Sequence, residues 1–165
     1  MEYNIYNFTK KPEQDIYHDI LYIAQKLCSF FVLVIRKDIG CGEKICELQN
    51  TLKPFLIRSY ESKEWPGTIL LDDCACVYEY KLCDDTAIIL RNNAKSLFEW
   101  QQPEFPEDLC FMRKAGKPWL ISISHENDAY VQMTKKEYQY IAEHAPNLSA
   151  NLWRQRDEPG AANDE

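Results

Sequence analysis

The part of the chain that decides its fold reads PEFPEDLCFMRKAGKPWLISISHE, residues 103–126. The central Lys-Ala-Gly-Lys segment has the composition of a short turn, and apolar residues are frequent on both sides of it. After the turn, Trp119, Ile121 and Ile123 occupy every second position, and two serines occupy the alternate positions 122 and 124. Because side chains alternate between the faces of a strand, we predict a β-hairpin with Trp119, Ile121 and Ile123 on its core-facing side.

The segments after this hairpin predict one more strand and a helix. Residues 129–133 are predicted as the strand, and Thr134 with Glu137 forms the capping-box pattern that begins a helix. Ile141 then lies on the apolar side of that helix. Residues 154–165 are polar, contain a Pro-Gly pair and lack apolar anchors, so we expect a disordered tail there.

Before the hairpin, apolar spacing predicts an amphipathic helix over residues 12–28 and a second helix that ends before Pro54. Between them, Phe30–Arg36 (FFVLVIR) is a run of aromatic and β-branched residues, which is typical of a strand buried on both faces. Near Asp84 a short helix through Asn92 is one interpretation, and a strand over residues 87–90 is the alternative. Further strands are predicted over residues 2–8, 55–60, 68–71 and 76–82.

These elements predict an α+β fold. We expect a single domain over residues 1–153, with a central, mostly antiparallel sheet and three to four helices. A hydrophobic fraction of 45% is ample for the core of one domain of this size.

Charge and hydropathy exclude several classes of function. The net charge is −7, and no cluster of basic residues is larger than a pair, so we expect no nucleic-acid binding. The longest apolar run, residues 30–35, is far shorter than the ~20 residues that a membrane span needs. The N-terminal residues lack the basic and apolar blocks of a secretory signal, so we expect a cytoplasmic protein.

The cysteines and glycines do not predict a metal or cofactor site. The seven cysteines include no Cys-x2-Cys pair, the spacing that aims two thiolates at one zinc ion, so we interpret them as reduced core residues. None of the five glycines belongs to a phosphate-binding motif. We therefore expect neither a metal nor a cofactor.

Two hypotheses about function remain. Cys110 on one hairpin strand and His125 at the end of the other contain the groups of a nucleophile and its base, as in a small cysteine-dependent hydrolase or transferase. The position of His125 argues against this role. His125 continues the alternation of Trp119, Ile121 and Ile123, which favours a residue at the end of a strand that hydrogen-bonds to the backbone. The preferred hypothesis is a non-catalytic inhibitor of a basic protein, because an acidic surface steers such a partner into contact. The candidate contact residues, which we expect in turns with freely projecting carboxylates, are Asp72, Asp73, Asp84, Asp85, Glu107 and Asp108.

Several segments resemble a group of small bacterial proteins. They are Trp65–Thr68 (WPGT), residues 97–100 (LFEW), Pro103 with residues 106–111 (PEDLCF), and residues 119–126 (WLISISHE). The group is similar to the cytoplasmic immunity proteins that accompany polymorphic and contact-dependent growth-inhibition toxins. The resemblance covers about a third of the chain and implies that the protein binds and neutralises one cognate toxin domain without catalysis. It identifies neither the toxin nor the residues that contact it.

Overall fold

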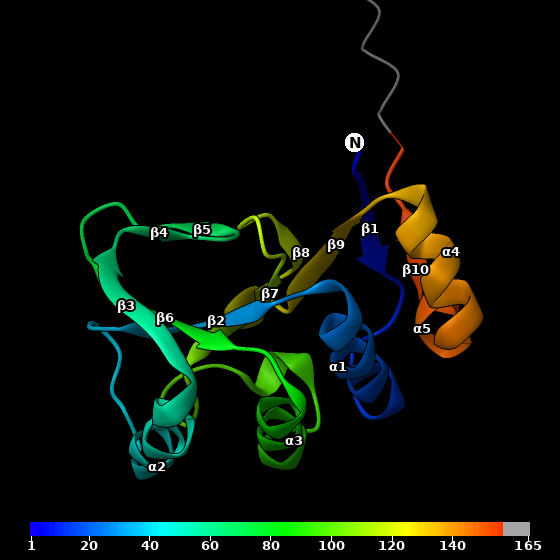
Figure 1. Cartoon of the computed structure of the whole chain (residues 1–165). Coiled ribbons are helices and arrows are strands. Elements are labelled where there is room, and N and C mark those ends of the chain that lie inside the picture. Colours follow the sequence, from blue (N-terminus) through cyan, green and yellow to red (C-terminus); the bar gives the residue numbers. More distant parts are fainter. Residues whose placement is uncertain (157–165) are drawn as a thin grey trace, which may run out of the picture.

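The computed structural model describes residues 1–156 and confirms the α+β prediction (Figure 1). These residues contain five helices and an eight-stranded sheet in which every neighbouring pair is antiparallel. Both the sheet and the number of helices are larger than the sequence predicted. No helix among residues 1–156 is both long and apolar enough to cross a membrane.

The strands of the large sheet lie in the spatial order β10 (Leu152–Arg154), β1 (Asn4–Phe8), β9 (Asp128–Met133), β8 (Pro118–Ile123), β7 (Glu107–Met112), β2 (Phe30–Arg36), β6 (Ala75–Lys81) and β3 (Leu56–Ser62). The helices are α1 (Asp15–Leu27), α2 (Glu43–Leu52), α3 (Asp84–Asn93), α4 (Lys135–His144) and α5 (Pro146–Ala150). A separate two-stranded hairpin consists of β4 (Glu64–Trp65) and β5 (Thr68–Ile69). Short 3-10 turns are η1 (Lys53–Phe55), η2 (Leu97–Glu99) and η3 (Ser124–Glu126).

The central sheet is covered on both faces, by different elements. Helices α1, α2 and α3 lie along one face, and the β4–β5 hairpin lies across the other (Figure 1). On β2, Phe31 and Leu33 pack with the helix-side core, whereas Val32 and Val34 pack with Trp65 of the hairpin. The prediction that this strand is buried on both faces is therefore confirmed.

Local signals in the sequence account for most element boundaries. The predicted capping box is present: Glu137 N donates to Thr134 Oγ1 (3.2 Å), and Thr134 N donates to Glu137 Oε2 (2.8 Å), at the start of α4. The segment after residue 83 is a helix, and the strand alternative is wrong. Its cap is Cys83, whose N–H donates to Thr86 Oγ1 (2.9 Å), rather than an aspartate.

The prediction that Trp119 lies on the same face of β8 as Ile121 is wrong. Residues Phe111 and Met112 pair with Leu120 and Pro118, so one extra residue is inserted into β8 at Trp119. Such a bulge reverses the parity of the strand. Trp119 therefore packs in the helix-side core, while Ile121 packs in the core beneath the hairpin.

The C-terminal prediction needs one correction. Arg154, placed at the start of a disordered tail, belongs to β10 and pairs with Tyr6 of β1. The backbone N–H of Gln155 also donates to Ile5 O (2.8 Å), which extends the pairing of β10 with β1. The rest of the predicted tail, residues 157–165, lies outside the described residues.

Candidate functional site

The first two residues of β7 are a buried pair of acids. Glu107 is 2% exposed and Asp108 is 0% exposed, so the prediction that they project from a turn is wrong. Strand β7 lies between β8 and β2 and is covered by the hairpin and the helices. Any residue at this position of the sheet is therefore removed from solvent.

An irregularity of β7 brings the two carboxylates together. Neighbouring residues of a regular strand point to opposite faces. Here Val32 and Val34 pair with Cys110 and Glu107, which leaves an extra residue in β7, and Asp108 has a left-handed φ of 55°. This conformation is uncommon for residues other than glycine, is tolerated best by Asn and Asp, and often occurs at functional sites. As a result, carboxylate oxygens of both residues lie within 4.8 Å of each other and of a ring nitrogen of His125.

Asp108 joins three segments of the chain. Its Oδ2 accepts a hydrogen bond from Trp65 Nε1 (2.9 Å), and its Oδ1 accepts one from Ser124 N (2.9 Å). Burial raises the pKa of Asp108, and these two hydrogen bonds oppose that rise because they stabilise the carboxylate. The side chain thus attaches the β4–β5 hairpin and η3 to β7.

Glu107 has one satisfied and one unsatisfied oxygen. Its Oε1 accepts a hydrogen bond from Gln102 N (3.2 Å), whereas its buried Oε2 receives none within the described residues. The imidazole of His125 lies beside this oxygen: its Nδ1 is 3.9 Å from Oε2, and its side chain is 40% exposed. Burial and the neighbouring Asp108 raise the pKa of Glu107.

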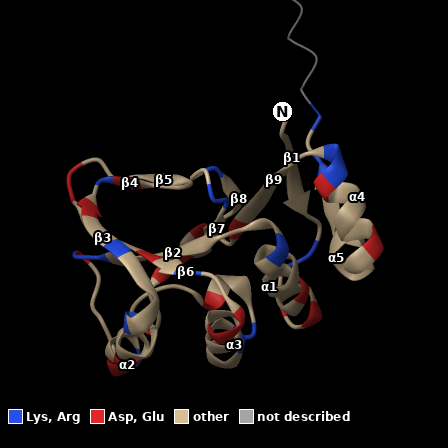
Figure 2. Ribbon diagram, viewed as in Figure 1, with Lys and Arg blue, Asp and Glu red and all other residues tan. Residues whose placement is uncertain are grey.

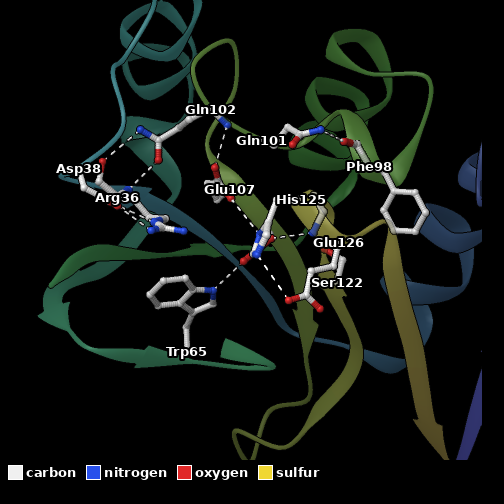
Figure 3. A network of polar contacts seen from close by, with 12 residues as sticks. Arg36, Asp38, Trp65, Phe98, Gln101, Gln102, Glu107, Ser122, His125 and Glu126 are labelled. Atoms are coloured by element: carbon white, nitrogen blue, oxygen red, sulfur yellow. Dashed lines mark hydrogen bonds and ion pairs between the residues drawn. The ribbon is translucent and has the colours of Figure 1, made fainter. Parts of the chain in front are cut away.

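The segment before β7 is held in place by Gln102. Its Oε1 accepts a hydrogen bond from Arg36 N (2.7 Å), and its Nε2 donates to Arg36 O (3.2 Å) and Ile39 O (3.1 Å). The Arg36 guanidinium is engaged by Asp38, with a contact of 2.7 Å between Nη2 and Oδ2 (Figure 3). The cation beside the acidic pair is therefore already paired.

Two carboxylates and an imidazole are groups that can exchange protons or ligate a metal ion. Among residues 1–156, Glu107, Asp108 and His125 are the one group of acids, cysteines and histidines close enough to hold a metal ion, and no cysteine belongs to it. All three residues are candidates in the sequence, but no sequence motif connects them. The available signal was position: the acids begin the first hairpin strand, His125 follows the second, and antiparallel pairing makes those two ends neighbours.

The structure gives no support to a nucleophilic Cys110. The thiol is fully buried, its closest polar contacts are Pro66 O (3.9 Å) and Ser122 O (4.0 Å), and burial raises its pKa to about 12. A nucleophile requires an accessible thiolate. The ring of His125 faces Glu107 and Glu126, not the backbone as predicted.

The remaining acidic candidates are exposed but lie in two separate places. Asp72 and Asp73 belong to the loop between β5 and β6, whereas Asp84 and Asp85 form the first turn of α3. Strand β6 separates the two pairs, and its seven residues span roughly 20 Å. Carboxylates in the first turn of a helix also stabilise its dipole, which accounts for the α3 pair without a partner.

Comparison with models of protein families, with curated proteins and with solved structures gives no significant match for this chain.

Proposed function

We propose that this chain is a non-catalytic binding protein that neutralises a cognate bacterial toxin domain in the cytoplasm. The surface that makes the contact is the segment of residues 69–73, which consists of the last residue of β5 and the loop that follows it and is called here the 69–73 loop. The observation that carries the proposal is the exposure of two large apolar side chains on this loop, next to two exposed aspartates. The resemblance of the sequence to immunity proteins supports the class of partner.

The apolar side chains of the 69–73 loop are unusually exposed. Ile69 is 73% exposed and Leu71 is 88% exposed, whereas most large apolar residues of this chain are buried. Contiguous exposed apolar surface on a soluble domain commonly marks a contact surface, because its burial stabilises a complex. We infer that Ile69 and Leu71 are the apolar anchors of the interface.

The fold holds the 69–73 loop away from the sheet. Leu70 N donates to Lys63 O (2.7 Å) at one end, and Ala75 pairs with Ser62 at the other. Because both ends are fixed beside the same turn of the chain, the residues between them project outward. Fixed ends limit the conformations open to the loop, which lowers the entropic cost of binding.

The charge around the 69–73 loop favours a basic partner. Neither Asp72 nor Asp73 forms an ion pair within residues 1–156, and neither does the exposed Glu64 nearby, whereas Glu61 is paired with Lys37. Figure 2 shows the acidic residues that gather at this end of the molecule. Unpaired carboxylates attract a basic surface over about one Debye length, 8–10 Å at physiological salt. A toxin domain with a cationic cleft fits this arrangement.

A matched pair of variants tests the proposal. The full chain is used to capture proteins from lysate of its source cells, and a captured toxin domain is titrated by calorimetry. We expect a one-to-one complex with a basic domain whose activity is lost on binding. The triple variant Leu71→Ser, Asp72→Asn, Asp73→Asn should weaken the complex at least tenfold, and Asp84→Asn with Asp85→Asn should leave the affinity within twofold.

The outcomes separate the interface from the function. Loss of affinity in the α3 variant, with none in the loop variant, would overturn the assignment of the 69–73 loop. A tight complex that leaves the domain's activity intact would overturn the inhibitory function. Raising the salt concentration should slow association, because it screens the carboxylates; a rate that does not depend on salt would contradict electrostatic attraction.

A further inference from the structure

We propose that Glu107, Asp108 and His125 bind a divalent first-row transition-metal cation, with Zn²⁺ as the representative ion. This site is separate from the 69–73 loop and does not depend on the proposed function. Two carboxylate oxygens and one imidazole nitrogen would ligate the ion, and water or a group of a partner would complete its coordination.

The three side chains are close enough for a common ion. One ligand atom from each lies within 4.8 Å of the others. Bonds of ~2.0–2.2 Å around one metal ion place its ligand atoms ~3–4 Å apart. The ligand atoms therefore need to approach one another by only about 1 Å to coordinate one ion.

An unsatisfied buried oxygen points independently to a ligand. Oε2 of Glu107 receives no hydrogen bond within the described residues, its side chain is 2% exposed, and it faces Nδ1 of His125 at 3.9 Å. A buried carboxylate oxygen without a hydrogen-bond partner destabilises the fold, because it has lost its hydration and gained no bond in exchange. A cation between Glu107 and His125 removes this cost, and it also relieves the repulsion between Glu107 and Asp108.

The site is organised before any ion binds. Asp108 is fixed by hydrogen bonds from Trp65 Nε1 and Ser124 N, and each of its oxygens keeps a free lone pair for a metal. Outer partners of this kind orient metal ligands and raise affinity. The left-handed backbone of Asp108, uncommon for a residue other than glycine, is what turns its carboxylate toward that of Glu107.

The ligand set selects the class of ion. Imidazole nitrogen together with carboxylate oxygen favours transition metals over Mg²⁺ and Ca²⁺, which prefer oxygen ligands alone. The half-exposed ring of His125 gives the ion a path from solvent. No arginine or lysine among the described residues forms an ion pair with Glu107 or Asp108; the guanidinium of Arg36, whose charge acts on both acids, is paired with Asp38.

Calorimetric titration of the full chain with ZnCl₂ at pH 7 tests the site. The exposed and partly exposed cysteines are first replaced by serine, so that accessible thiols do not bind the metal; they are Cys41, Cys46, Cys74, Cys76 and Cys83. We expect one bound ion per chain and at least tenfold weaker binding in each of the variants His125→Gln and Glu107→Gln. His144→Gln is the matched control, since His144 is exposed on α4 outside the group, and its affinity should equal that of the parent.

Three results would overturn the proposal. They are no heat of binding, an affinity unchanged by His125→Gln, and an affinity for Mg²⁺ equal to that for Zn²⁺. His125→Gln changes a half-exposed side chain, so the variant is expected to fold, and its circular dichroism spectrum verifies this. The expected rise of the melting temperature with Zn²⁺ in the parent, absent in His125→Gln, is a second readout, because an ion that binds the folded state stabilises it.

Discussion

The β4–β5 hairpin separates two regions of opposite character. Between the hairpin and the sheet, Trp65 of the hairpin and Asp108 and Cys110 of β7 are buried. At the far end of the hairpin, the 69–73 loop is open to solvent. Each region contains two consecutive acids, Glu107–Asp108 and Asp72–Asp73. The net charge of −7 counts these pairs equally, but only the exposed pair contributes strongly to the field that a partner meets. The buried pair instead joins segments of the chain.

The largest expected difference between these regions is in thiol reactivity. Cys110 lies beneath the hairpin with its pKa raised to about 12, and Cys41 is exposed. Because the thiolate is the reactive form, we expect iodoacetamide to alkylate Cys110 at least 100-fold more slowly than Cys41 in the folded protein. Mass spectrometry of peptides from timed reactions measures both rates. Equal rates would show that the hairpin does not seal this region.

The next largest effect is expected on stability. Asp108→Ala leaves two buried donors, Trp65 Nε1 and Ser124 N, without an acceptor and places alanine at a φ of 55°. We expect a loss of about 2–4 kcal/mol in the free energy of unfolding, measured by urea titration. Relief of the repulsion with Glu107 offsets only part of this loss. A change below about 0.5 kcal/mol would contradict the structural role of Asp108.

A smaller effect is expected when only one of these hydrogen bonds is removed. Trp65→Phe keeps an aromatic ring in the core beneath the hairpin but deletes the N–H that binds Asp108 Oδ2. We expect a loss of about 1–2 kcal/mol, less than that of Asp108→Ala, in the same urea titration. If the two variants lose equal free energies of unfolding, the Ser124 hydrogen bond and the strained backbone at residue 108 do not contribute to the effect of Asp108→Ala.

The smallest effect is expected in the 69–73 loop. The triple variant Leu71→Ser, Asp72→Asn, Asp73→Asn changes exposed side chains that form no ion pair within residues 1–156. Its free energy of unfolding should stay within about 0.5 kcal/mol of the parent. A larger loss would mean that the loop serves the fold, and its exposure could then no longer be taken as a sign of binding.

Local patterns predicted the elements well where neighbouring residues decide the conformation. The run Phe30–Arg36 predicted β2 with the bounds that the structure has, because β-branched and aromatic residues favour an extended, fully packed chain. The capping box at Thr134 and Glu137 predicted the start of α4, because its hydrogen bonds span only three residues.

The face on which a side chain lies, and its burial, were predicted poorly in the strands that contain a β-bulge, β7 and β8. The face on which Trp119 lies and the common orientation of the Glu107 and Asp108 carboxylates both follow from an extra residue in one strand of a pair. A bulge is defined by the partner strand, and β2 is more than 70 residues away from β7 along the chain. Patterns within one strand therefore do not reveal it. Hairpin pairing alone places Glu107 near His125, but the left-handed conformation of Asp108 that adds the second carboxylate belongs to the bulge.

The sequence alone determined the α+β class, the central strands and the capped helices, because propensity, periodicity and capping act over a few residues. The tertiary structure decided which acids are buried and which are exposed. That outcome depends on what packs over each position, and Trp65 of a distant hairpin is the residue that covers and binds Asp108. Aspartate is therefore buried and hydrogen-bonded at position 108 but exposed at position 72, because the free energy of a carboxylate depends on its surroundings.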